Sequence, residues 1–125
     1  MGPLNRRILV VEDESSLRAL FRRRAERAGL RVLEAVTSAQ GVALAAVERP
    51  DLILLDLHLR DGNGIELIER LKADPRTARI PVIAWSGSDA EESEADVMRV
   101  GAAGYFEKRD LKGLIIKIVE LTRPR

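Results

Sequence analysis

The sequence has no cysteine, no large excess of either charge and no long apolar run, and each absence excludes a class of protein. Without cysteine the chain has no disulfides and no thiolate metal sites, which fits a reducing cytosol. The 21 lysines and arginines balance the 20 acidic residues, so no strong field attracts nucleic acid or an anionic membrane. The apolar run Ile8 to Val11 is too short for a signal-peptide core, and no segment approaches the roughly 20 apolar residues of a membrane helix. We therefore expect a soluble, cytoplasmic protein that contacts neither nucleic acid nor membrane directly.

The length and composition predict one folded unit. A chain of 125 residues has the size of one domain, and a hydrophobic content of 46% is enough for one core. We find no internal repeat, linker or low-complexity segment. We expect a single domain over residues 1–125, with its core over about 7–121.

Short β-branched or leucine-rich segments alternate with segments of helical periodicity along the chain. This alternation is typical of a doubly wound parallel sheet with helices on both faces, a three-layer α/β/α fold. The segment 52–55 is apolar without alternation, which predicts a central strand buried on both faces. A helix is expected after each of the five predicted strands, which are residues 8–11, 31–35, 52–55, 82–85 and 104–106.

Local signals predict where some helices begin. Thr37 with Gln40 forms a capping box for the second helix, and Asp110 caps the last one. A turn is predicted over residues 61–64, leading into the third helix. The fourth helix is predicted over residues 89–100, with acidic residues near its N-terminus, where the helix dipole favours them.

Polar residues stand at the ends of four of the five predicted strands. Ligands of an open parallel sheet bind beyond the carboxyl ends of its strands, so these ends are where a site is expected. The interiors of the same strands are apolar. The polar residues are Glu12 and Asp13 after the first strand, Asp56 after the third, Ser86 after the fourth and Lys108 after the fifth.

Three carboxylates at one sheet edge predict a cation site. Like charges resist ionisation unless a cation neutralises them, and Mg²⁺, with Mn²⁺ as its substitute, prefers such oxygen ligands. Three carboxylates, one divalent ion and the Lys108 ammonium sum to zero charge. An ionised Asp56 is then a nucleophile, and the ion and Lys108 stabilise the charge on a phosphoryl group in transfer.

Each of these residues also has a structural alternative. Glu12 and Asp13 would serve the dipole of the following helix, and Asp56 would be a turn residue. Ser86 would be a cap or loop hydroxyl, and Lys108 a solvated surface lysine. The sequence motifs described next, taken together, favour the cation and phosphoryl site over these structural alternatives.

Five motifs in order carry a resemblance to a known family. The sequence resembles a receiver domain of the two-component response regulators, of the chemotaxis-regulator type, from Ile8 to about Leu121. Any one motif is weak, and the five in order are specific. The motifs are ILVVEDE at 8–14, PDLILLD at 50–56, DGNG at 61–64, IPVIAWS at 80–86 and GAAGYFEK at 101–108.

The resemblance implies a fold and a role for each site residue. The fold is flavodoxin-like, with five helices and the strand order 2-1-3-4-5. Glu12 and Asp13 hold Mg²⁺, and Asp56 both coordinates it and accepts a phosphoryl group from the phosphohistidine of a sensor kinase. His58 adds its backbone carbonyl to the metal, and Lys108 pairs with the phosphoryl oxygens.

The resemblance also implies a switch. The hydroxyl of Ser86 moves toward the phosphoryl group and lets Tyr105 turn inward, which reshapes the surface of the fourth helix, fifth strand and fifth helix. The expected partners are a sensor histidine kinase or phosphotransfer protein and a downstream protein target or output domain. A homodimer through the fourth and fifth helices stays open. Self-catalysed dephosphorylation resets the switch, so the chain is a signalling protein rather than a turnover enzyme.

Three residues depart from the family pattern. Arg60 and Arg109 stand where prolines are common, and Trp85 stands where a smaller aliphatic residue is common. A non-proline cis peptide costs about 2.5 to 4 kcal/mol, so a cis bond after Lys108 is unfavourable. We expect the Lys108 loop to differ in shape or mobility, and Trp85 to alter packing beside the switch.

Two other functions compete with the switch. A phosphohydrolase with an aspartyl nucleophile typically has a second aspartate two residues later, where this chain has His58. A receiver that only binds a partner is the other alternative, suggested by Arg60 and Arg109. His58 is the only histidine, and a relay role for it is a weak third alternative because a strand-end loop is a poor setting for one.

Overall fold

The computed structural model describes residues 6–87 and 94–124. Its main sheet has five parallel strands in the order β2-β1-β3-β6-β7. Numbered within this sheet alone, the order is 2-1-3-4-5, so the predicted doubly wound topology is confirmed. The strands are β1 (Arg7–Val11), β2 (Arg31–Ala35), β3 (Leu52–Asp56), β6 (Val82–Ser86) and β7 (Gly104–Glu107).

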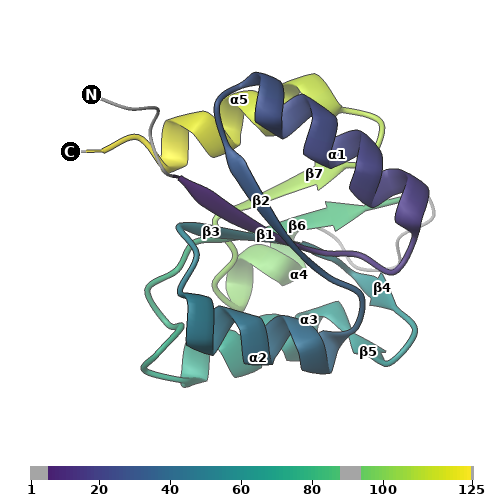
Figure 1. Ribbon diagram of the computed structural model, residues 1–125. Helices are drawn as coiled ribbons and strands as arrows, with labels where there is room; N and C mark the ends of the chain where they lie inside the picture. Colours follow the sequence, from purple (N-terminus) through teal and green to yellow (C-terminus); the bar gives the residue numbers. More distant parts are fainter. Residues whose placement is uncertain (1–5, 88–93, 125) are drawn as a thin grey trace.

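Helices cover both faces of this sheet (Figure 1). Helices α1 and α5 lie on one face, and α2, α3 and α4 lie on the other, which gives the three predicted layers. The predicted fourth helix began at residue 89, and residues 89–93 lie outside the described ones. The bounds are α1 (Ser15–Arg27), α2 (Ser38–Glu48), α3 (Gly64–Ala73), α4 (Glu94–Arg99 in its described part) and α5 (Leu111–Leu121).

The sheet separates two apolar cores. Side chains of a strand point alternately to opposite faces. On β1, Ile8 and Val10 join the core under α1 and α5, whereas Leu9 and Val11 join the core under α2, α3 and α4. All four are fully buried or nearly so, which explains why the middle strands are apolar without alternation.

A small hairpin follows β3 where the sequence predicted only a turn. Strands β4 (His58–Leu59) and β5 (Gly62–Asn63) pair antiparallel, and α3 begins directly after them. A Cβ atom on Gly64 would lie 2.6 Å from the Cα of Leu57, so only glycine fits there. The hairpin thus returns the chain tightly against the end of β3.

The predicted helix caps are present. Thr37 Oγ1 accepts a hydrogen bond from the Gln40 N–H at 3.1 Å, and the Asp110 carboxylate accepts one from the Gly113 N–H at 3.0 Å. The Gln40 side chain accepts from the N–H of Val36 at 2.7 Å, one residue beyond the cap residue that a capping box would use.

Strand β2 lies at an outer edge of the sheet, and a side chain of α1 reaches it. The Arg22 guanidinium donates to the backbone carbonyl of Val32 at 3.1 Å and contacts Glu34 at 2.7 Å. One arginine of α1 therefore occupies a carbonyl group on the open side of β2.

None of the helices within the described residues combines the length and the apolar character that crossing a membrane requires.

Candidate functional site

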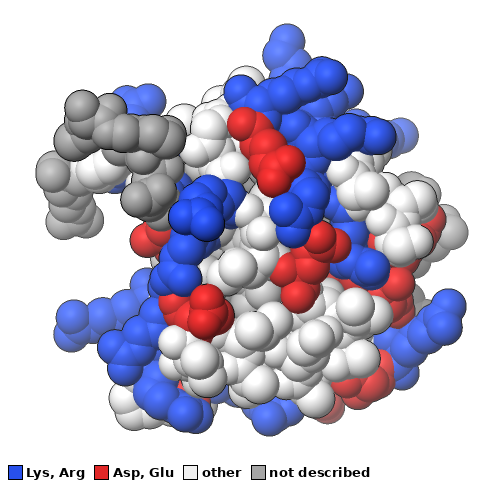
Figure 2. All heavy atoms as spheres, in the orientation of Figure 1, with Lys and Arg blue, Asp and Glu red and all other residues white. Residues whose placement is uncertain are grey.

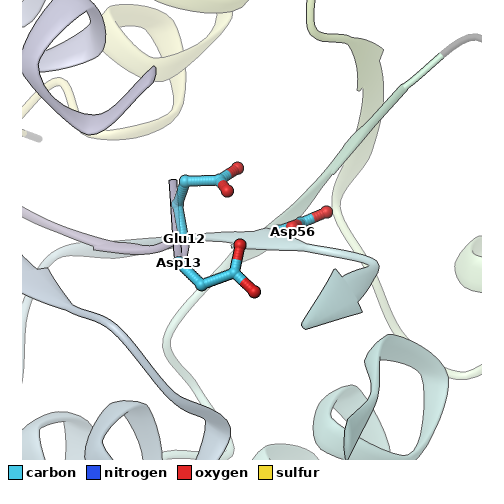
Figure 3. Close-up of side chains that lie close together, drawn as sticks. All are labelled: Glu12, Asp13 and Asp56. Atoms are coloured by element: carbon cyan, nitrogen blue, oxygen red, sulfur yellow. The ribbon is translucent and has the colours of Figure 1, made fainter. Parts of the chain in front are cut away.

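Three carboxyl groups meet beyond the ends of β1 and β3. Glu12 and Asp13 directly follow β1, and Asp56 is the last residue of the neighbouring β3. One oxygen of each carboxylate lies within 4.8 Å of the others. Figure 3 shows the three groups turned toward the same region. The predicted convergence of these side chains is confirmed.

Two of the three carboxylates are buried. Glu12 is 1% exposed and Asp56 is 3% exposed, while Asp13 is half-buried. Desolvation by burial raises the pKa of Glu12, and the nearby charge of Asp56 adds to this, although hydrogen bonds from Lys108 and from the Glu14 N–H act the other way. The protein therefore places carboxyl groups where water hardly screens them and where ionisation of Glu12 is disfavoured.

Lys108 lies within this cluster. Its Nζ is 2.8 Å from Glu12 Oε1 and 3.3 Å from Asp56 Oδ1. Burial lowers the pKa of Lys108 by desolvation, but the hydrogen bond with Glu12 and the charge of Asp56 outweigh this, so the pKa is raised. The ammonium is therefore charged and opposes part of the negative charge.

The lysine reaches the cluster although Arg109 follows it. The Lys108 N–H donates to the Ser86 carbonyl at 2.8 Å, which ties the loop after β7 to the end of β6. The Arg109 side chain turns to Glu107, with Nε and Oε2 2.6 Å apart. The described residues contain no cis peptide bond.

Asp56 receives a second donor from the hairpin that follows it. The His58 N–H donates to Asp56 Oδ1 at 3.0 Å. Among the described residues, the two donors that contact Asp56, His58 N–H and Lys108, therefore both go to Oδ1. A metal contact through the His58 carbonyl stays a prediction.

Arg60 contacts Asp13, a pairing that the sequence did not indicate. The Arg60 N–H donates to Asp13 Oδ2 at 3.3 Å, and its Nε lies 3.7 Å from the same oxygen. The Arg60 side chain is 94% exposed, so this charge pair is well screened by water. The loop position that departs from the family pattern thus lies at the mouth of the cluster.

The two predicted switch residues lie on neighbouring strands. Ser86 is fully buried, and its hydroxyl donates to the Gly87 carbonyl at 3.0 Å. Tyr105 is half-buried and packs against the core under α2, α3 and α4. Both switch roles stay predictions. A surface pocket of about 340 Å³ is lined by Tyr105, Glu94, Phe106, Glu107 and Asp110.

Trp85 belongs to the surroundings of the site, although the sequence suggested only a packing change there. It is fully buried on β6 and pairs in register with Asp56 of β3. Its ring centroid lies 5.7 Å from Lys108 Nζ. A signal was available, because Trp85 precedes Ser86 in a strand expected next to the one that ends at Asp56.

The donor set fits a hard divalent cation. Every converging side chain offers carboxylate oxygen, the ligand type that Mg²⁺ and Ca²⁺ prefer. Three carboxylates against one ammonium leave two negative charges in a largely buried cluster. The buried Glu12 Oε1 contacts only the Lys108 ammonium among the described residues, at 2.8 Å.

Comparison with protein families identifies the fold. A model of the response regulator receiver domain matches residues 8–120. The chain belongs to the response regulator receiver family. Both the resemblance and the signalling class predicted from the sequence are thereby confirmed.

Curated relatives of this receiver are transcriptional regulators and a smaller protein. It is 41% identical over 101 residues to the KDP operon transcriptional regulatory protein KdpE of Escherichia coli, covering 81% of this chain and 44% of KdpE. It is 36% identical over 121 residues to the phosphate regulon regulator PhoB of Pseudomonas aeruginosa, covering 94% of this chain and 53% of PhoB. Protein PilH of the same species is 35% identical over 102 residues, covering 82% of this chain and 84% of PilH. The receiver thus spans about half the length of KdpE and PhoB.

Solved structures agree with the receiver fold. A response regulator protein from Burkholderia multivorans is 29% identical, with a TM-score of 0.75 and 98% of each chain covered. The receiver domain of the Francisella response regulator 1452 has a TM-score of 0.86 at 23% identity, covering 95% of this chain and 98% of that one, and supports the fold alone.

Proposed function

We propose that this receiver accepts a phosphoryl group on Asp56 and that the modification switches a protein-interaction surface. The donor is the phosphohistidine of a sensor kinase or phosphotransfer protein. One observation supports this most: the Asp56 carboxylate lies with two further carboxylates within 4.8 Å and is contacted by an ammonium at 3.3 Å. This is the arrangement that phosphoryl transfer needs, because its catalysis is mostly positioning and charge stabilisation.

Mg²⁺ is the proposed cofactor, with Glu12, Asp13, Asp56 and the His58 carbonyl as its ligands. When bound, the ion supplies positive charge to the phosphoryl oxygens. The residues of the chain do the rest. The carboxylates of Glu12 and Asp13 hold the charge of the site, and the short hairpin after β3 fixes the loop that carries His58.

The geometry favours one oxygen of Asp56 as the nucleophile. Both donors from the described residues go to Oδ1, which leaves Oδ2 to attack phosphorus. The new O–P bond forms as the P–N bond to the donor imidazole breaks, and the electron pair leaves with that imidazole, which is protonated by solvent. Hydrolysis of the acyl phosphate later returns the carboxylate and inorganic phosphate.

Ser86 and Tyr105 are the proposed transmitters of the change. The Ser86 hydroxyl donates to Gly87 in this structure, and it can leave that carbonyl for a phosphoryl oxygen. Tyr105 lines the pocket between α4, β7 and α5 and is only half-buried, so its ring has room to change position. The surface of these elements is the proposed contact for a downstream target.

Labelling with a small phosphodonor tests the proposal. With acetyl phosphate and Mg²⁺, we expect one added phosphoryl group by mass spectrometry in the wild type and none in Asp56→Ala. Asp51→Ala is the matched control, because Asp51 lies directly before the opposite end of the same strand, where its carboxylate accepts from the Arg7 N–H. This control should label like the wild type.

Other outcomes select the competing functions. Undiminished labelling of Asp56→Ala would place the acceptor elsewhere and contradict the proposal. No labelling with several donors, together with partner binding indifferent to Asp56→Ala, would select a receiver that only binds. Steady multiple turnover of phosphate monoesters would select a phosphohydrolase.

A further inference from the structure

Trp85 lies directly beside the proposed phosphoacceptor. In the sheet register it is the partner of Asp56 on the adjacent strand, and it belongs to the core under α1 and α5. Strand alternation puts Asp56 on the same face, since Leu52 and Leu54 of β3 belong to that core as well. The indole and the carboxylate are therefore neighbours on one side of the sheet.

The indole ring lies under the ammonium of Lys108. The distance from Nζ to the ring centroid is 5.7 Å, within the range of about 6 Å over which a cation is attracted to an aromatic face. Tryptophan has the strongest such attraction among the aromatic residues. The ammonium thus has three neighbours, the ring and the carboxylates of Glu12 and Asp56.

Packing alone does not explain an indole at this position. Trp85 is fully buried, yet its Nε1–H has no acceptor among the described residues. A buried donor without a partner destabilises a fold, and a phenylalanine or leucine would fill apolar space without that cost. The contact with Lys108 is the gain that the indole brings.

The indole ring of Trp85 packs against a second aromatic ring. Phe21 of α1 is fully buried, and its ring centroid lies 5.9 Å from that of Trp85 with the planes tilted by 59°. Tilted aromatic pairs at this separation are favourable. Phe21 therefore restrains the indole in the orientation that faces Lys108.

Lys108 needs such a restraint because its stem is flexible. The backbone of Lys108 is tied to β6 by the hydrogen bond from its N–H to the Ser86 carbonyl, whereas its tip contacts only the two carboxylates and the ring of Trp85 among the described residues. A lysine side chain has many rotamers and carries its charge at a single point, so its tip is poorly positioned without further contacts. The next residue, Arg109, does not help to position the lysine, because the Arg109 side chain turns away to Glu107.

We propose that Trp85 is a positioning residue for Lys108, holding the ammonium against Asp56 so that it meets the incoming phosphoryl oxygens. The inference rests on the proposed phosphoryl transfer to Asp56. Trp85 does not touch the reacting atoms and acts only through the lysine. Its removal therefore slows transfer without weakening the binding of Mg²⁺.

Kinetics of labelling by acetyl phosphate test the role of the ring. Trp85→Leu should lower the rate constant at saturating Mg²⁺ and donor about tenfold, which corresponds to the loss of a partly buried cation–π contact. Trp85→Phe keeps an aromatic face and should recover the rate to within about threefold of the wild type. The Mg²⁺ dissociation constant should stay within about twofold in both variants, because no carboxylate is changed.

Two controls separate positioning from simple damage to the core. Ile83→Ala removes volume from the same strand and the same core, two residues from Trp85, and should lower the melting temperature while the labelling rate stays within about twofold. In a Lys108→Met background, Trp85→Leu should change the residual rate less than about twofold, since the ring has no ammonium to hold. Equal rates in the wild type and Trp85→Leu, or the full tenfold loss without the lysine, would overturn the inference.

A spectroscopic measurement tests the contact without any phosphoryl transfer. A cation over an indole face places the lysine ε-protons in the shielding region of the ring, so we expect upfield Lys108 Hε signals by NMR that return to ordinary values in Trp85→Leu. Ordinary shifts in the wild type would refute the inference. If the wild type is not labelled but these signals are upfield, the proposed phosphoryl transfer to Asp56 is contradicted, whereas the contact between Trp85 and Lys108 is supported.

Discussion

The molecule has two clusters of charged side chains, one at the strand ends and one on the surface of α1 and β2, and they differ in what neutralises them. The strand-end cluster consists of Glu12, Asp13, Asp56 and Lys108. Two of its carboxylates are almost fully buried, and its single ammonium cannot balance three negative charges, since the Arg60 side chain beside Asp13 is 94% exposed and well screened. The strand-end cluster therefore has less positive than negative charge.

The surface cluster consists of Arg18, Arg22, Glu26 and Glu34, so two positive charges face two negative ones. Glu34 contacts Arg18 at 3.0 Å and Arg22 at 2.7 Å, and its side chain is 32% exposed. Burial alone would raise the pKa of Glu34, but hydrogen bonds from Arg22 and Arg18 outweigh this and lower it. Figure 2 shows the basic side chains gathered over α1 on this side of the molecule.

Contacts of similar length between charged side chains thus have different energetic effects in the two clusters. Where water and balanced partners surround the charges, the pairs add modestly to stability. Where burial leaves charge uncompensated, the fold is weakened and a cation gains affinity. The strand ends are therefore where we propose a cation site, and the α1 surface is not, although both contain contacts below 3 Å.

The largest effect should come from removing the one ammonium of the strand-end cluster. Without Mg²⁺, Lys108→Met should lower the free energy of unfolding by about 3 kcal/mol, because it leaves buried carboxylates unpaired. Arg22→Met on the surface should cost about 1 kcal/mol or less. Urea unfolding of both variants measures the difference, and Mg²⁺ should restore part of the stability of Lys108→Met. Equal losses of stability in the two variants would show that the two clusters do not differ in charge balance.

A smaller effect of opposite sign is expected for Asp13→Asn. Removing one of three neighbouring negative charges should raise the free energy of unfolding without Mg²⁺ by about 1 kcal/mol. The same substitution should weaken Mg²⁺ binding about tenfold or more, because it removes a proposed ligand. Thermal unfolding and titration calorimetry measure the two quantities. A loss of stability in the metal-free protein would show that the cluster is not short of positive charge.

The smallest effect should appear in the surface cluster and depend on pH. The folded pKa of Glu34 is lowered, so its contribution to stability is present above the ordinary value of 4.5 and is lost as the pH falls through the folded value. At pH 7, Glu34→Gln should cost about 0.5 to 1 kcal/mol. This difference from the wild type should shrink as the pH is lowered through the acidic range. Urea unfolding at several pH values checks it, and a constant difference would contradict the assigned cause.

The convergence of the carboxylates could be predicted because it follows from topology. Parallel strands end at the same edge of a sheet, so Glu12 and Asp56 had to be close once their strands were recognised as neighbours. The caps at Thr37 and Asp110 could be predicted from the sequence as well, because each cap bonds to a residue only three positions away. That residues 1–125 form a single domain stays a prediction.

Other contacts could not be predicted, because tertiary packing decides them. The sequence placed Trp85 on a strand, but whether its ring would lie under Lys108 depends on rotamers set by Phe21 and the core. The pairing of Arg60 with Asp13 depends on the path of the hairpin, which the sequence indicated only as a turn. The spacing of residues along the chain predicts neither of these two contacts.

The arginine on the outer strand edge has a consequence for the protein in a crowded cell. An open sheet offers its last strand as a template for strands of other molecules. The guanidinium of Arg22 already occupies the Val32 carbonyl and is anchored by Glu34, so an incoming strand would have to displace a charged side chain from both. The residue that links α1 to β2 thus makes the addition of a foreign strand to β2 less favourable.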